Sequence, residues 1–151
     1  MLKKTLIVLG IFLALAMLFF GLIQLVPYGR NHTDPGIVQE PAWNDPQTRD
    51  LAARACFDCH SSQTNWPWYT NIAPISWLTQ HDVDEGRRRL NFSDWNPNSR
   101  TVRSISRAIS EGNMPPSYYR MIHPSAQLSD AEKQLLIQGL HASGISLSAL
   151  K

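Results

Sequence analysis

The only two cysteines of the 151-residue chain, Cys56 and Cys59, lie three positions apart and are followed at once by His60. Two thiols with this spacing can form thioether bonds to the two vinyl groups on one edge of a porphyrin, and the next imidazole can then bind the iron. The motif therefore predicts one covalently attached haem c per chain, with His60 as the proximal iron ligand. In so small a domain, that group would make up much of the core.

A zinc site and a redox-active dithiol are two other uses for such a cysteine pair. A zinc site usually has about four protein ligands, and the sequence holds no second cysteine pair to complete one. A thioredoxin-like dithiol is expected beside a βαβ pattern, which the neighbouring sequence lacks. The motif favours covalent haem over a redox dithiol or a chance arrangement.

An almost purely apolar run extends from residue 6 to residue 26, directly after Lys3 and Lys4. About 20 helical residues cross a bilayer core, so we expect residues 1–26 to be a transmembrane anchor. A cleaved signal peptide has a shorter apolar region and a small-residue cleavage site, and an uncleaved anchor is therefore favoured. The basic pair predicts that the N-terminus lies inside the cell and the rest of the chain outside.

The formal net charge of +2 is misleading, because Lys3 and Lys4 lie on the inner side of the predicted anchor. The exported part then has equal numbers of acidic and basic residues, which argues against a nucleic acid as partner. Residues 27–45 are rich in proline and polar residues and are predicted to be a flexible tether. We expect the haem domain at residues 46–142 and a tail at 143–151.

Helical periodicity and capping patterns predict a small all-α domain. Asp45 is a suitable N-cap for the first helix, and Ser129 with Glu132 forms a capping box before the last one. Gly139 is expected to let the last helix approach the first closely. The predicted helices cover residues 46–56, 75–90, 99–111 and 130–141.

A dense group of aromatic residues and prolines follows the motif. Trp66, Trp68 and Tyr69 could wall the haem and direct their polar N–H and O–H groups to a propionate or a carbonyl, or they could simply fill the core. Arg87 lies near the end of a predicted helix, where it would either pair with a haem propionate or, more simply, be solvated.

Met114 is the preferred candidate for the sixth iron ligand. It follows a predicted helix end and precedes two prolines, which would hold its thioether on a stiff extended segment. A Met/His ligand pair raises the reduction potential of a haem. His81 and His123 are the main rivals, His141 and Met121 are weaker ones, and an open sixth position is a further alternative.

The order helix, Cys-x-x-Cys-His, loop, helix, Met-Pro and capped last helix resembles a class I-type monohaem cytochrome c. Over about residues 45–142, the chain is more closely similar to a family of exported bacterial haem-binding domain proteins. The matching residues include Asp58-Cys59-His60-Ser61, Trp66-Pro67-Trp68-Tyr69, His81, Gly86-Arg87, Leu90-Asn91-Phe92-Ser93 and Met114-Pro115. The resemblance implies attachment outside the bacterial cytoplasmic membrane, where covalent haem is added. The tryptophan-proline segment departs from the usual cytochrome loop and leaves open how the proximal face is covered.

These features predict a single-pass protein of the bacterial cytoplasmic membrane whose c-type haem carries single electrons on the periplasmic side. Its partners would be redox proteins of a membrane electron-transfer chain, and it would not be an enzyme. The alternative is a haem-based sensor or small peroxidase-like enzyme with a displaceable sixth ligand. A third possibility is a module that uses its haem structurally inside a larger complex.

Overall fold

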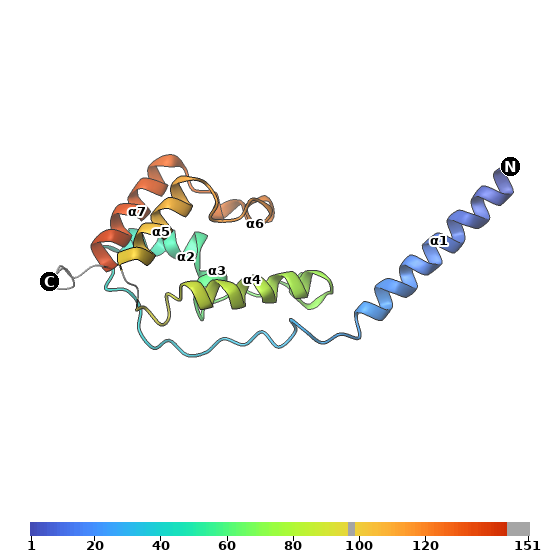
Figure 1. Ribbon diagram of the computed structural model, residues 1–151, viewed down its shortest axis with the longest axis horizontal. Helices are drawn as coiled ribbons and strands as arrows, with labels where there is room; N and C mark the ends of the chain where they lie inside the picture. Colours follow the sequence, from blue (N-terminus) through green and yellow to red (C-terminus); the bar gives the residue numbers. More distant parts are fainter. Residues whose placement is uncertain (97–98, 145–151) are drawn as a thin grey trace. The chain divides into compact units, whose positions relative to one another are not determined.

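The computed structural model describes residues 1–96 and 99–144, and every regular element in these ranges is a helix (Figure 1). This confirms the predicted all-α class with one apolar helix at the N-terminus. The elements are α1 (Leu2–Ile23), α2 (Pro46–Ala55), α3 (Phe57–His60), the 3-10 turn η1 (Trp68–Asn71), α4 (Ile75–Arg89), α5 (Ser99–Ser110), α6 (Ser117–Ile122), the 3-10 turn η2 (Pro124–Ala126) and α7 (Asp130–Gly144). The chain divides into two compact units, one made of Met1–Thr33 and Trp66–Asp82, the other of Asp34–Asn65 and the residues from Val83 onward.

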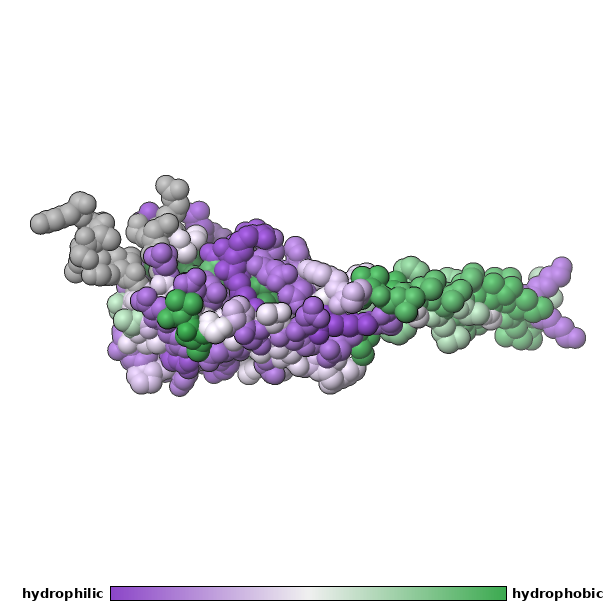
Figure 2. Space-filling view, turned by 90° about the horizontal axis from the view of Figure 1, so that it is seen from below, coloured by the Kyte–Doolittle hydropathy of each residue, from purple (hydrophilic) through white to green (hydrophobic). Residues whose placement is uncertain are grey.

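In the first unit, α1 is apolar after Lys3, Lys4 and Thr5, and none of its residues is buried. Figure 2 shows a hydrophobic surface along most of this helix and a hydrophilic patch at its outer end. Its length and composition suffice to cross a membrane, criteria that an N-terminal signal sequence also satisfies. Beyond α1, the same unit contains residues 24–33, η1 and the first part of α4.

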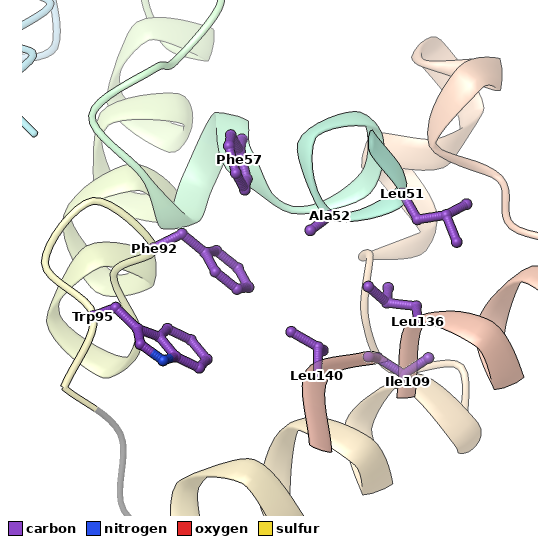
Figure 3. Packing of buried hydrophobic residues seen from close by; sticks show 8 residues of the cluster. All are labelled: Leu51, Ala52, Phe57, Phe92, Trp95, Ile109, Leu136 and Leu140. Atoms are coloured by element: carbon purple, nitrogen blue, oxygen red, sulfur yellow. The ribbon is translucent and has the colours of Figure 1, made fainter. Parts of the chain in front are cut away.

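In the second unit, a single hydrophobic core joins helices that are distant in sequence (Figure 3). The rings of Phe92 and Trp95 stack at a centroid distance of 5.3 Å, and Phe57 lies 5.4 Å from Phe92. Helix α2 contacts α3 and α7, and α7 also packs on α5. The core residues are Leu51, Ala52, Phe57, Phe92, Trp95, Ile109, Leu136 and Leu140.

The contact between α2 and α7 depends on Gly139. A Cβ atom at this position would lie 2.1 Å from Oγ1 of Thr48 on α2, so only a glycine allows this approach. The predicted close packing of the last helix on the first is thus confirmed. The predicted caps also form: Asp45 accepts a hydrogen bond from the N–H of Thr48, and Ser129 exchanges hydrogen bonds with Glu132. Helix α7 continues into the predicted tail as far as Gly144, and residues 145–151 lie outside the described part.

The second half of the predicted tether is bonded to the domain. Glu40 forms a bidentate ion pair with Arg49 of α2. Nε and Nη2 of Arg49 donate to the two carboxylate oxygens at 2.8 and 2.9 Å. The backbone N–H groups of Val38 and Gln39 donate to the carbonyl of Ser93. From Asp34 onward, the stretch that we expected to be flexible thus belongs to the second unit and is hydrogen-bonded to it, although residues 34–39 are exposed.

Candidate haem attachment site

The Cys-x-x-Cys-His motif forms one helical turn attached to the core. The N–H of Cys56 donates to the carbonyl of Ala52 and ends α2, and the Cys56 carbonyl then accepts from Cys59 and His60 at 3.2 and 2.9 Å. The side chain of Phe57 is buried in the core and fixes this turn from inside. The two thiols and the imidazole are half-buried on the same short element, as covalent haem attachment requires.

The imidazole of His60 is oriented by backbone carbonyls. Its Nδ1 lies 2.9 Å from the carbonyl oxygen of Gly86 and 3.1 Å from that of Leu90. Carbonyls only accept hydrogen bonds, so Nδ1 carries the proton and Nε2 keeps its lone pair. Burial lowers the pKa of His60, against the opposite effect of the two carbonyls, and so favours the neutral ring. A neutral imidazole held through Nδ1 is the form that binds a metal through Nε2.

Gly86, in the last turn of α4, brings that helix against the motif. A Cβ atom on Gly86 would lie 2.1 Å from the carbonyl oxygen and 2.8 Å from the carbonyl carbon of Cys59. Its own carbonyl accepts from His60, and the carbonyl of His60 accepts from the N–H of Phe92 at 2.7 Å. Sequence analysis did not assign Gly86 a role, although a glycine inside a helical pattern often marks a close backbone approach.

The donor set fits a haem better than a zinc ion or a dithiol. No group of three or more His, Cys, Asp or Glu side chains that could hold a metal ion occurs in the described ranges 1–96 and 99–144. Burial and the neighbouring Cys59 raise the pKa of the Cys56 thiol to about 12, whereas redox-active dithiols have a thiolate of low pKa. A porphyrin brings four nitrogen ligands of its own, so one oriented imidazole and two thiols are what the chain must add.

A family model described as a haem-binding domain matches residues 18–142. The chain belongs to this family. The match includes the motif, all helices of the second unit up to residue 142, and Met114. Neither the comparison with curated proteins nor that with solved structures found a match.

In this haem-binding domain, Arg87 holds the loop that follows the motif. Its guanidinium donates to the carbonyl of Ser61 at 2.7 Å, to Oγ1 of Thr64 at 2.9 Å and to Asp34 at 2.5 Å. The side chain is largely buried by these contacts. Stabilising this loop is thus its structural role, and the pairing of Arg87 with a haem propionate stays a prediction.

Asp58, between the two cysteines, links the motif to α6. Its carboxylate accepts from the hydroxyl of Tyr119 at 2.5 Å and from the backbone N–H of Asn65 at 2.9 Å. The ring of His123 stacks on Tyr119 at a centroid distance of 4.1 Å. No periodic or motif signal in the sequence pointed to this link, because it joins residues 61 positions apart.

Met114 lies on a fixed backbone just after α5. Gly112 has a φ of 71°, a left-handed conformation that suits glycine at a helix end, and both Asn113 and Met114 donate their N–H groups to the carbonyl of Ala108. The side chain of Met114 is 42% exposed. Met114 was assigned as an iron ligand because a stiff backbone would hold its thioether, and its backbone is indeed constrained. The assignment of Met114 as the ligand stays a prediction.

The rival ligands lie in different surroundings. His123 is stacked on Tyr119, Met121 is 78% exposed, and Nε2 of His141 lies 3.0 Å from the hydroxyl oxygen of Ser106. His81 is exposed and belongs to the first unit.

The three aromatic residues expected at the haem also belong to the first unit. Trp66 stacks on His32 at a centroid distance of 4.4 Å, and Trp68 is 75% exposed with its ring edge-on to Tyr69. Their contribution to a haem pocket stays a prediction.

Proposed function

We propose that this haem-binding domain protein is a membrane-anchored monohaem c-type cytochrome that carries single electrons on the outer side of the cytoplasmic membrane. The observation that supports it best is the state of His60: directly after the two cysteines, its Nδ1 is held between two backbone carbonyls while Nε2 keeps its lone pair. Sequence, geometry and family membership all agree with a haem at this turn.

Each proposed role follows from the chemistry of the side chain. The sulfur atoms of Cys56 and Cys59 would hold the haem through thioether bonds, and Nε2 of His60 and the thioether of Met114 would bind its iron. When bound, the haem supplies a one-electron couple at its iron. The carbonyls of Gly86 and Leu90 fix the plane and the tautomer of the imidazole, which limits the rearrangement that accompanies a change of charge.

Electron transfer is favoured over catalysis because two protein ligands leave no coordination position for a substrate. In this proposal α1 is the anchor, and Lys3 and Lys4 keep its N-terminus on the inner side. Confinement to the membrane would raise the effective concentration of the domain near membrane-bound redox partners.

The direct test is an absorption spectrum of the full-length protein, purified from cells that are competent in cytochrome maturation, in both oxidation states and with carbon monoxide. We expect a c-type haem that stays with the polypeptide on acid-acetone extraction and a reduced spectrum that carbon monoxide leaves unchanged. Rapid binding of carbon monoxide would instead favour the sensor or peroxidase-like alternative. A colourless protein whose two thiols can be alkylated would refute the proposal.

Replacing Met114 with alanine tests the second ligand. We expect a lower reduction potential and binding of carbon monoxide, because the thioether that stabilises the reduced iron is lost. Met121→Ala is the matched control, since this methionine is exposed and should leave both properties unchanged. An unchanged spectrum in Met114→Ala would transfer the assignment to His123 or His81, whose alanine variants would then show the effect.

A further inference from the structure

The segment that begins at Trp66 is joined to the end of α1 by paired hydrogen bonds. Nε2 of Gln24, the first residue after the helix, donates to the carbonyl of Ala73 at 2.9 Å. Oε1 of the same side chain accepts from the N–H of Ala73 at 3.0 Å. Ala73 is fully buried, so the side-chain amide satisfies both backbone groups of a residue 49 positions away.

Two further contacts in the first unit join the same stretches. Gly29, with a φ of 79°, lies so close to α4 that a Cβ atom would come within 2.1 Å of the carbonyl oxygen of Ser76. His32 stacks on Trp66, and its Nε2 lies 3.3 Å from the carbonyl oxygen of Thr70. Together with the Gln24 pair, these contacts fix residues 66–76 to the chain that leaves α1.

The length of α1 indicates the depth in the membrane at which Gln24 and Ala73 are hydrogen-bonded. After Lys3, Lys4 and Thr5, the apolar residues 6–23 of this helix extend over roughly 27 Å at 1.5 Å per residue, close to the thickness of about 30 Å of a bilayer's hydrocarbon core. With α1 spanning the membrane, Gln24 lies where the core meets the lipid headgroups. Ala73, hydrogen-bonded to Gln24, lies at the same level.

Large apolar side chains beside this attachment point are exposed. They are Trp68 on η1, Ile75 and Leu78 in the first turn of α4, and Tyr28 after α1. Trp68 is 75% exposed, and Ile75 and Leu78 are 44% and 50% exposed. Tryptophan and tyrosine are enriched at the headgroup level of membranes, where one end of the ring is apolar and the other is hydrated.

We propose that Trp68, Ile75 and Leu78 form a membrane-docking surface that inserts into the headgroup region of the bilayer that α1 spans. This inference rests on the anchoring role of α1 proposed above. The occupant is the lipid surface, because the attachment at Ala73 continues directly from the end of the spanning helix. Residues 66–78 would then contact the lipid headgroups beside the point where the chain leaves the membrane.

The test uses the full-length wild-type protein in liposomes of phosphatidylcholine and phosphatidylglycerol that contain a phospholipid with a photoactivatable diazirine. After illumination, mass spectrometry maps the residues that carry lipid adducts. We expect adducts on α1 and on residues 66–78. In the variant Gln24→Leu, labelling of residues 66–78 should fall while that of α1 persists.

The outcomes separate the two proposals. Adducts on α1 alone in the wild-type protein would overturn the docking surface and leave the anchor intact. An absence of adducts from both segments would overturn the anchor as well. Cross-links from residues 66–78 to a second protein chain, without lipid adducts there, would assign the surface to a protein contact and also overturn the inference.

Discussion

Replacement of Gly86 by alanine should disturb the haem site without removing any ligand. The added Cβ atom would lie 2.1 Å from the carbonyl oxygen of Cys59 and 3.1 Å from its Cβ, where ordinary contacts begin at 3.4 Å. The end of α4 and the motif must therefore separate by roughly 1.3 Å, the difference between the 3.4 Å and 2.1 Å distances. Neither neighbour is a flexible side-chain end that could move aside, since the closest atoms belong to the backbone.

The loss of stability expected in Gly86→Ala has two parts. Forcing an extra methyl group into a packed contact typically costs about 1–3 kcal/mol. The same separation stretches the 2.9 Å hydrogen bond from His60 to the Gly86 carbonyl beyond its useful range, which costs about 1 kcal/mol more. We therefore expect the free energy of unfolding to fall by about 2–4 kcal/mol. Loss of an acceptor at Nδ1 makes the imidazole a weaker donor to iron, so the reduction potential should rise.

Urea denaturation of the full-length haem-loaded protein in detergent, followed at the Soret band, measures the first effect, and a redox titration measures the second. Gly36→Ala is the control, because its added Cβ atom would have no neighbour within 4 Å. If Gly86→Ala matched this control in both stability and potential, the close approach of α4 to the motif would be refuted.

Three further changes test other contacts. Gly139→Ala should lower the free energy of unfolding by about 1–3 kcal/mol, measured by urea denaturation, and adding Thr48→Gly should restore part of that loss because the overlapping side chain is gone. The hydrogen-bonded Arg49 guanidinium lowers the pKa of Glu40 to about 2, so this carboxylate stabilises the fold above about pH 4.5 and the effect is lost as the pH falls toward 2. Glu40→Gln should therefore be about 1–2 kcal/mol less stable at pH 7, with a difference that vanishes near pH 2 in acid titrations. Tyr119→Phe should lower the free energy of unfolding, measured by urea denaturation, by about 1–2 kcal/mol, because the Asp58 carboxylate loses a hydrogen-bond donor. An unchanged stability would show that this hydrogen bond is not formed.

Local signals in the sequence were sufficient to predict the longer helices α2, α4, α5 and α7, but not the short helix α3. Asp45 before a proline, the Ser129–Glu132 pair and the spacing of apolar residues each report on neighbours within one or two turns. The contact of Gly139 with the first helix could also be predicted, because a glycine within an amphipathic helix suggests a close neighbour and few other helices were available. The packing of α7 on α2 thus follows from pattern, whereas the burial of Phe57, Phe92 and Trp95 in the core was not predicted.

The contacts that orient the site could not be predicted in the same way. The partners of the His60 imidazole are backbone carbonyls 26 and 30 positions further along the chain, and every residue type has such a carbonyl. The predicted tether shows a related limit for side chains. The composition of residues 27–45 gave no sign that Glu40 would pair with Arg49. Motifs identify the atoms that do chemistry, but contacts through the backbone leave no specific residue type to find.

Two tight helix contacts together hold the motif turn. Gly139 lets α7 press against α2, the helix that leads into Cys56, and Gly86 lets α4 press against Cys59 at the other end of the turn. Between them, Phe57 is buried in the core. The turn that carries the thiols and the imidazole is therefore held from both sides by packing among protein groups. In the proposed electron carrier, a site held in this way would change little when the iron changes charge.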